Sequence, residues 1–384
     1  MYDFVGYTRV QSHIQEEWVM GHVTNWIGID DHADSWTIAQ FIAEGTEPAR
    51  EWELVPTESG YRKLIGWIKG MPGDVRVVYE AGPCGYELYR RLRKSKIACE
   101  VAAPSLTPRK PGDRVKTNRG DACKLARLYR AGELTLIAVP DEHREAARDL
   151  VRARQATSKD LHRAQHQLSK LLLRYGHRYR NGKSWTQRHW NWIRAIKLSE
   201  CSQMVVDETI VSVEQKLAQL ARYDKVIESL SKEKEFAPWV EALVVLRGIS
   251  TLTAMILVTE LGDLRRFGKP TQLMAAIGLV PSEYSTGDHT RRYGITKTGN
   301  AHVRHVAVEA SWHYQKRASS GAKVQARRKG KPQVLVDIAT KCELRLNRRF
   351  NRLTSRGKRS TVAAVAVARE LAGFIWAIGQ QVHQ

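Results

Sequence analysis

The sequence has few cysteines, and none of them has the spacing of a metal or disulfide site. Five cysteines are scattered over 384 residues without a CxxC pair. This argues against a zinc knuckle and a disulfide framework, and it fits a reducing compartment. The sequence also lacks a basic start followed by an apolar run, and no apolar run has the length of a membrane span. We therefore expect neither a signal peptide nor a membrane partner.

Acidic residues are outnumbered by basic ones. The chain has 62 Lys and Arg against 40 Asp and Glu, a formal net charge of +22, while 42% hydrophobic residues are enough for real cores. An excess of this size favours a polyanionic partner, most often nucleic acid, over a merely basic soluble protein.

The first part of the chain alternates strand and helix signals, which predicts an α/β domain over residues 23–140 after an N-terminal extension, 1–22. The expected strands are 23–42 (two strands around a turn), 75–81, 96–103 and 134–140, and the expected helices are 60–70, 86–95 and 121–131.

Proline is absent from residues 141–237, and strand signals almost disappear there. Apolar residues recur at three and four positions, which predicts two long helices forming a helical hairpin or coiled coil. The aromatic and basic stretch between them contains Trp185, Trp190 and Trp192. These indoles either stack on exposed bases or pack between the helices, and the sequence favours neither.

Residues 238–384 are expected to form a mainly α domain. A helix, a turn at Gly248 and a second helix resemble a helix-hairpin-helix, in which the turn would direct N–H groups at a phosphate; plain helix packing explains the spacing equally well. The apolar helix at the end, within 361–380, is expected to be core or interface, because charge interrupts it too much for a membrane span.

Two carboxylates follow strands of the α/β domain. Asp30 ends the first strand and Glu80 ends another, and Asp121 lies in the first turn of a following helix. Carboxylates gathered at one crevice suit Mg²⁺, and such ions can position a phosphodiester for in-line attack. Singly, each is weak evidence, because Asp is common in turns and helix caps.

A second block, residues 281–305, combines Ser285 and Thr286 with Gly287 and several cations. A hydroxyl beside cations can attack a phosphodiester; a basic loop with Ser and Thr as turn residues is the simpler reading of the spacing. The residues that we expect to contact nucleic acid are Arg291, Arg292, Lys297, Asn300, Arg304, Arg327, Arg328, Lys329, Arg348 and Arg349.

Several motifs in order resemble one family. They are WIGID (26–30), VVYEAGP (77–83), RVKTNRGDACKLARLYRAGELT (114–135), LRGISTLTAMILVTELGDLRRF (246–267), GLVPSEYSTGDHTRRYGITKTGNAHVRHVAVEASWHY (278–314) and ARELAGFIWAI near the end. Over nearly all of 23–380 the chain resembles the DEDD transposases of bacterial insertion sequences, a group that also includes Piv-type DNA invertases.

The resemblance implies a RuvC-like, RNase-H-type N-terminal domain with a four-residue metal set for Mg²⁺ or Mn²⁺. Carried over by position, the set is Asp30, Glu80, Asn118 and Asp121. The family motif KTD reads KTN here, so an amide stands where the family has a carboxylate. An amide oxygen is a weaker ligand without charge. The site therefore binds metal more weakly, recruits a nearby acid such as Asp113, or is inactive.

The resemblance also implies a nucleophilic serine, which we assign to Ser285, with Thr286 as the alternative. It further implies a structured noncoding guide RNA from the element that pairs with target and donor DNA, a dimer or tetramer with composite active sites, and a nucleoid-associated location in the bacterial cytoplasm. The alternatives are a Piv-like invertase or RuvC-like nuclease without a guide, a non-catalytic nucleic-acid-binding remnant, and an ordinary basic protein.

Overall fold

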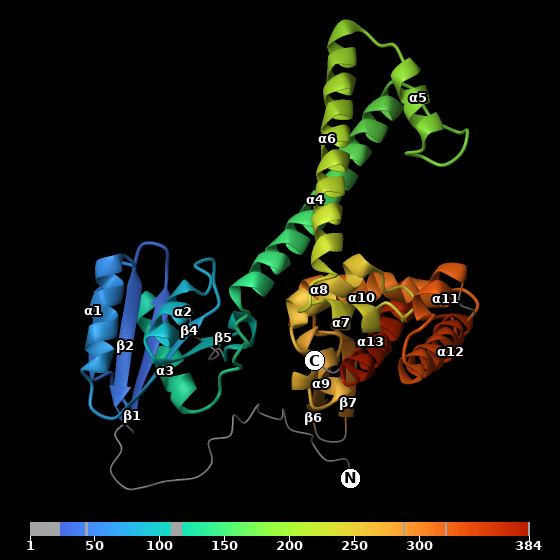
Figure 1. Ribbon diagram of the computed structural model, residues 1–384. Coiled ribbons are helices and arrows are strands. Elements are labelled where there is room, and N and C mark those ends of the chain that lie inside the picture. Colours follow the sequence, from blue (N-terminus) through green and yellow to red (C-terminus); the bar gives the residue numbers. More distant parts are fainter. Residues whose placement is uncertain (1–23, 43–44, 109–116, 287–288, 319–320, 383–384) are drawn as a thin grey trace. The chain divides into compact units, whose positions relative to one another are not determined.

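The computed structural model describes residues 24–42, 45–108, 117–286, 289–318 and 321–382, and the chain divides between Val139 and Pro140 into two compact units. The first unit is mixed α/β and the second is mostly helical, as predicted (Figure 1).

The first unit is a five-stranded sheet with helices on both faces. The strands run in the order β3-β2-β1-β4-β5, with β1 at the centre, antiparallel to β2 and parallel to β4. The elements are β1 (Thr24–Asp31), β2 (Trp36–Ile42), β3 (Arg50–Leu54), α1 (Glu58–Lys69), β4 (Asp74–Glu80), α2 (Glu87–Lys94), β5 (Ala98–Ala102) and α3 (Asn118–Arg130). Apolar residues of α1 and α2 pack on one face, and α3 covers the other.

Two strand predictions in this unit were wrong. Strand β3 pairs with β2 but was not predicted, because its charged sequence REWEL gives no apolar alternation. Residues 134–140 were predicted as a strand, yet they form only one bridge, between Leu136 and Ala102 at the edge of β5. Ile137 and Val139 still pack against the core, so their apolar pattern reports burial without a strand ladder.

The second unit is a helical arm on a globular base (Figure 1). Its elements are α4 (Glu142–Arg174), α5 (Gln187–Ala195), α6 (Glu200–Leu230), α7 (Ala237–Leu243), α8 (Thr251–Leu261), α9 (Pro270–Ala276), β6 (Pro281–Thr286), β7 (His289–Ile295), α10 (Ala301–Ser311), α11 (Ala322–Arg328), α12 (Gln333–Ser355) and α13 (Ser360–Gly379).

The arm is a pair of antiparallel helices. Leu168 and Leu172 of α4 pack with Val206 and Ile210 near the start of α6, whereas the beginning of α4 packs near the end of α6. The predicted long helices are therefore confirmed, and they pair as a helical hairpin.

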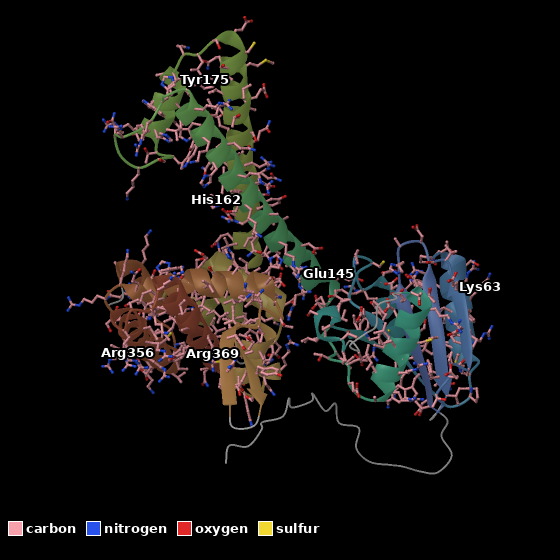
Figure 2. The ribbon with its side chains drawn as sticks, turned by 180° about the vertical axis from the view of Figure 1, so that it is seen from behind. Lys63, Glu145, His162, Tyr175, Arg356 and Arg369 are labelled. Atoms are coloured by element: carbon pink, nitrogen blue, oxygen red, sulfur yellow. The ribbon has the colours of Figure 1, made fainter. Side chains whose placement is uncertain are left out.

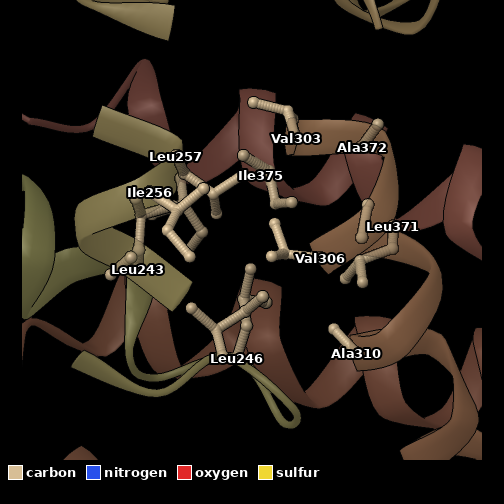
Figure 3. Packing of buried hydrophobic residues seen from close by; sticks show 14 of the residues in the cluster. Leu243, Leu246, Ile256, Leu257, Val303, Val306, Ala310, Leu371, Ala372 and Ile375 are labelled. Atoms are coloured by element: carbon tan, nitrogen blue, oxygen red, sulfur yellow. The ribbon is translucent and has the colours of Figure 1, made fainter. Parts of the chain in front are cut away.

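The base has one large apolar core, shared by α8, α10 and α13 (Figure 3). Leu257, Val306 and Ile375 meet there, and all residues of α8 from Ala254 to Leu261 are buried. By length and composition α13 could cross a membrane, which corrects the expectation that charge interrupts it too much. Its packing in this core accounts for its apolar composition.

Gly28 in β1 allows α3 to lie directly on the sheet. A Cβ atom at this position would lie 2.1 Å from the carbonyl oxygen of Ala122 and 2.7 Å from the amide nitrogen of Ala126. Both neighbours are backbone atoms of α3, so no side-chain movement can relieve the contact. The glycine of the WIGID motif thus fixes how closely this helix approaches the central strand.

We predict that Gly28→Ala destabilises the protein by at least about 2 kcal/mol, because the added methyl group forces α3 away from β1. Urea unfolding of the full chain, followed by tryptophan fluorescence, measures the effect. The matched control is Gly66→Ala in α1, where an added Cβ has no neighbour within 4 Å. This control should raise stability by about 0.5–1 kcal/mol. Equal stability of Gly28→Ala and the wild type would contradict the close approach.

Candidate functional site

Asp30 and Glu80 lie at the ends of neighbouring parallel strands. The pairing of β1 with β4 runs to Ile29 opposite Tyr79, and each carboxylate is the next residue of its strand. Side chains alternate along a strand, so Asp30 shares the face of Gly28, and Glu80 shares the face of Val78, which packs on α3. Both carboxylates therefore belong to the face that α3 covers.

The partners of these carboxylates are polar. His32 Nε2 lies 3.1 Å from Asp30 Oδ2, and the Thr107 hydroxyl donates to Glu80 Oε1 at 2.6 Å. The neighbouring Asp31 has a different role: Trp36 Nε1 donates to its carboxylate at 2.8 Å, and burial raises its pKa. Asp31 is thus held by the local turn.

The start of α3 brings Asp121 toward the same strand ends. Thr117 caps the helix by accepting from the Gly120 amide at 3.1 Å, and Ala122 contacts β1 at Gly28. Asp121 is half-buried, whereas Asn118 is exposed one turn earlier. A spacing of three residues places both on one helix face, and the N-terminal end of the helix dipole favours negative charge there.

These side chains share one edge of the unit but do not converge. No group of three His, Cys, Asp or Glu residues close enough to hold a metal ion occurs in the part of the chain that the structure describes. Asp113, the substitute acid considered from the sequence, lies outside the described residues. The donors at this edge are carboxylate and amide oxygens, which suit a hard divalent cation.

Ser285 lies on a β-hairpin of the second unit, where the sequence suggested a loop. Strands β6 and β7 pair with Ser285 opposite Thr290 and Thr286 opposite His289. The exposed Ser285 hydroxyl donates to Glu283 Oε1 at 2.9 Å. The sequence reasoning missed Glu283, although residues two apart on a strand share a face. The side chain of Thr286 and all of Gly287 lie outside the described residues.

A buried carboxylate, also missed, ties the base of this hairpin to the arm. The side chain of Glu260 in α8 is 1% exposed. Arg152 of α4 donates to its two oxygens at 2.6 and 2.9 Å, and Asn300 Nδ2 donates to Oε2 at 2.7 Å. Burial raises the pKa of Glu260, but the hydrogen bonds from Arg152 and Asn300 outweigh it, so the pKa lies below its ordinary value.

Asn300 connects this network to the start of α10 and to the end of α9. Its Oδ1 caps α10 by accepting from the Val303 amide at 2.9 Å, and its backbone N–H donates to the Ala276 carbonyl at the end of α9. Thr296, just after β7, donates to Val280, just before β6, at 2.9 Å. We refer to Arg152, Glu260 and Asn300 as the arm-base network. No local sequence pattern predicts this network, because Arg152 is 108 residues and Asn300 is 40 residues from Glu260.

Several cations expected to contact nucleic acid have partners inside the protein. Arg304 donates to the Ile277 carbonyl at 3.0 Å, and Arg327 donates to the Ile249 carbonyl. Arg328 is 10% exposed and pairs with the buried Glu343 at 2.9 Å, and Arg349 lies 3.3 Å from Glu370. The exposed residues of the expected set include Arg291, Lys297, Lys329 and Arg348.

Packing explains the turn at Gly248. Its φ of +85° lies in the left-handed region, and a Cβ there would lie 2.6 Å from the Ala310 carbonyl of α10. Arg327 and Arg328 donate to the carbonyls of Ile249 and Val245 on either side. Between the two readings of the sequence, these contacts favour helix packing over a phosphate-binding turn.

The three indoles between the arm helices also pack within the protein. Trp185, Trp190 and Trp192 lie against the cluster of Leu168 and Ile193 at the far end of the arm. The ring of Trp192 stacks on His189 at a centroid distance of 5.6 Å. The three indoles therefore pack within the protein, as one of the two sequence-based interpretations expected, and other side chains partly cover their ring faces.

Comparison with known proteins defines the class. Residues 240–327 match the family model described as "Transposase IS116/IS110/IS902 family", and residues 27–177 match the IS110 DEDD model described as "Transposase". The chain is 41% identical to "Putative transposase y4qE" of Sinorhizobium fredii over 94% of this chain and 89% of that protein. It is 30% identical to "Transposase for insertion sequence element IS1533" of Leptospira borgpetersenii, over 87% of this chain and 98% of that protein.

The class of protein is therefore a transposase, an enzyme that cuts and joins DNA during transposition. The chain belongs to the IS110/IS116/IS902 family of transposases.

Proposed function

We propose that this transposase is an RNA-guided DNA recombinase that inserts and excises a mobile element with two chemical sites. The first is a divalent-metal site of Asp30, Glu80, Asn118 and Asp121 in a RuvC-like unit. The second is the nucleophile Ser285 on the β6–β7 hairpin. The observation that carries the proposal is the placement of two carboxylates at neighbouring strand ends, with the start of α3 held against the same face.

The residues of the first site would hold Mg²⁺ or Mn²⁺ through oxygen atoms. When bound, such an ion polarises a phosphodiester and stabilises the charge of the departing oxygen. Thr107 and His32 hold the Glu80 and Asp30 carboxylates in position by hydrogen bonds. Asn118 contributes an oxygen ligand without charge, which lowers the affinity for the ion relative to aspartate.

Ser285 would attack the DNA backbone directly. Its hydroxyl already donates to Glu283 Oε1, so the carboxylate can accept the proton as the Oγ–P bond forms. One P–O ester bond of the DNA breaks in the same step, and the departing oxygen takes a proton from water. The DNA end stays covalently attached to the serine until a DNA hydroxyl displaces it.

Guidance by RNA rests on the family resemblance together with the net charge of +22. A protein of this charge can bind an RNA fold and two DNA duplexes largely through their phosphate backbones. In this proposal the enzyme works as a dimer or tetramer whose subunits share active sites. The specific observation that favours a second candidate, a nucleic-acid-binding remnant without catalysis, is the amide at Asn118.

We predict that Asp30→Ala and Glu80→Ala each abolish Mg²⁺-dependent cleavage of element-end DNA, because each removes a charged ligand. Binding of nucleic acid in a gel-shift assay should stay nearly unchanged. Asn118→Asp should lower the Mg²⁺ concentration needed for half-maximal cleavage, since a second carboxylate joins Asp121 on one helix face.

Unchanged cleavage in Asp30→Ala or Glu80→Ala would remove the metal-site proposal. No cleavage by the wild type, with no recovery in Asn118→Asp, would instead favour the remnant.

We predict that Ser285→Ala eliminates the covalent protein–DNA adduct seen on denaturing gels, because no other nucleophile replaces its Oγ. Thr286→Ala should leave the adduct in place and serves as the matched control. An adduct that persists in Ser285→Ala and disappears in Thr286→Ala would assign the nucleophile to Thr286.

We predict that the protein, expressed together with its flanking element DNA, co-purifies with one discrete RNA from that flank. Sequencing of the bound RNA is the measurement. Finding no RNA, or only random cellular RNA, would contradict guidance and shift support to an invertase-like enzyme without a guide.

A further inference from the structure

The segment that joins the two arm helices carries only positive charge. Residues 174–197, which we call the arm tip, contain seven Lys and Arg and no Asp or Glu. They are Arg174, Arg178, Arg180, Lys183, Arg188, Arg194 and Lys197. Within the described structure, Arg194 is the one member of this set that forms an ion pair, with Glu214 at 2.5 Å. Figure 2 shows Tyr175 at the far end of the arm, where this segment begins.

The arm tip is held in one conformation by an aromatic cluster. The Trp185 amide donates to Nδ1 of the buried His189 at 2.9 Å, and the Tyr179 ring lies 4.5 Å from the His189 ring. Burial lowers the pKa of His189, which keeps the ring neutral and able to accept this bond. Trp185 has a φ of +65°, a conformation that non-glycine residues adopt only where the surroundings enforce it.

This geometry separates the aromatic rings from the cations. The rings pack toward Leu168, Leu172 and the start of α6, whereas Arg178, Arg180, Lys183 and Arg188 are exposed. Tyr175 is 40% exposed and the three indoles are half-buried, so exposed cations outnumber the rings that are open to stacking. This composition favours contact with phosphates over stacking on unstacked bases. The aromatic cluster holds the backbone that carries these cations, which favours a duplex, whose phosphates are regularly spaced, over a flexible single strand.

The other end of the arm is joined to the helix that follows the serine-bearing hairpin. The arm-base network links α4 to α8 and to Asn300, which caps α10 five residues after β7 ends at Ile295. Gln155, one turn beyond Arg152, adds a contact of 2.5 Å to His302 Nδ1. Since α4 has 33 residues, the tip lies roughly 50 Å along the helix from its start.

We propose that the arm tip binds the phosphate backbone of a nucleic-acid duplex, and that the arm-base network holds this contact in a fixed position relative to the Ser285 hairpin. The chemistry of the ligand is common to DNA and RNA duplexes. The proposal deepens the proposed function and rests on it for the role of the hairpin. The binding and positioning that it describes are measurable without any cleavage.

The first test removes four tip charges in Arg178→Gln/Arg180→Gln/Lys183→Gln/Arg188→Gln. The matched control removes four exposed charges at the other end of the arm, two in the last turns of α6 and two just after it, in Arg222→Gln/Lys225→Gln/Lys232→Gln/Lys234→Gln. Binding to a DNA duplex and to a structured RNA hairpin is measured against salt concentration. The tip variant should bind at least one of them about 10- to 100-fold more weakly, with a salt slope smaller by roughly three.

Each result of this comparison decides the proposal. Weakening for DNA alone or for RNA alone supports it and identifies the nucleic acid. Equal affinities of the tip and control variants for both ligands would overturn it. Loss of self-association in the tip variant with unchanged affinity for both would make the tip a protein contact, and would overturn it as well.

The second test is Glu260→Gln. Three donors, two from Arg152 and one from Asn300, face two carboxylate oxygens, whereas a glutamine amide offers one acceptor oxygen. The variant should therefore loosen the arm base. Nitroxide labels on p-acetylphenylalanine at Gln187 and Tyr293, read by pulsed electron paramagnetic resonance, report the distance between tip and hairpin. The distance distribution should broaden in Glu260→Gln.

The control is Glu343→Gln, which removes the charge of another buried glutamate paired with an arginine in the same unit. This variant should keep the wild-type distribution, so that a general loss of stability is separated from loss of positioning. A wild-type distribution in Glu260→Gln, or equal broadening in both variants, would overturn the positioning role. Failure of the serine or metal chemistry leaves these distances unaffected, so the two proposals fail independently.

Discussion

The close approach of α3 to the central strand at Gly28 governs the arrangement of the first unit. Without a side chain at this position, the backbone of Ala122 contacts β1 directly. The same approach sets where the first turn of α3 lies along the strand, and so where Asp121 stands relative to Asp30. The sheet contributes the other half of this geometry, because parallel pairing aligns the ends of β1 and β4. A backbone contact thus determines the spacing of side chains that carry the proposed chemistry.

Most of the first unit was predictable because its signals are local. Helix α1 has an N-cap at Thr57 and a C-cap at Gly70, and the apolar runs of β1 and β4 are buried on both faces. The errors arise where pairing depends on a distant partner. Strand β3 is stabilised by its ladder with β2 despite a charged sequence, while residues 134–140 have an apolar pattern and lack a sustained ladder.

The sequence names the residue types of the candidate sites, whereas their hydrogen-bond partners depend on the fold. Ser285 is the predicted nucleophile, but its acceptor Glu283 is revealed only by the strand geometry of β6. Glu260 reads as an ordinary acid in an apolar helix, since nothing local reveals that Arg152 and Asn300 enclose it. Conversely, Arg327 and Arg328 read as surface cations, and the structure shows them bonded to carbonyls of the Gly248 turn. In a chain with this much positive charge, burial and partners distinguish structural cations from those available to a ligand.

The amide at Asn118 lies at the proposed metal site, where the carboxylates favour a cation and the positive end of the α3 dipole opposes it. Asp30, Glu80 and Asp121 bring at most three negative charges to the edge of the sheet, and aspartate at position 118 would bring a fourth. The positive end of the α3 dipole lies at the same place, which stabilises carboxylates in the absence of an ion. Each lost charge therefore weakens the attraction for a divalent cation while the helix end continues to oppose it. In the proposed site, an amide at position 118 supplies an oxygen of nearly the same size and position as an aspartate would, but no charge. The proposal therefore predicts that exchanging the two would barely change the shape of the site and would change its affinity for a divalent cation.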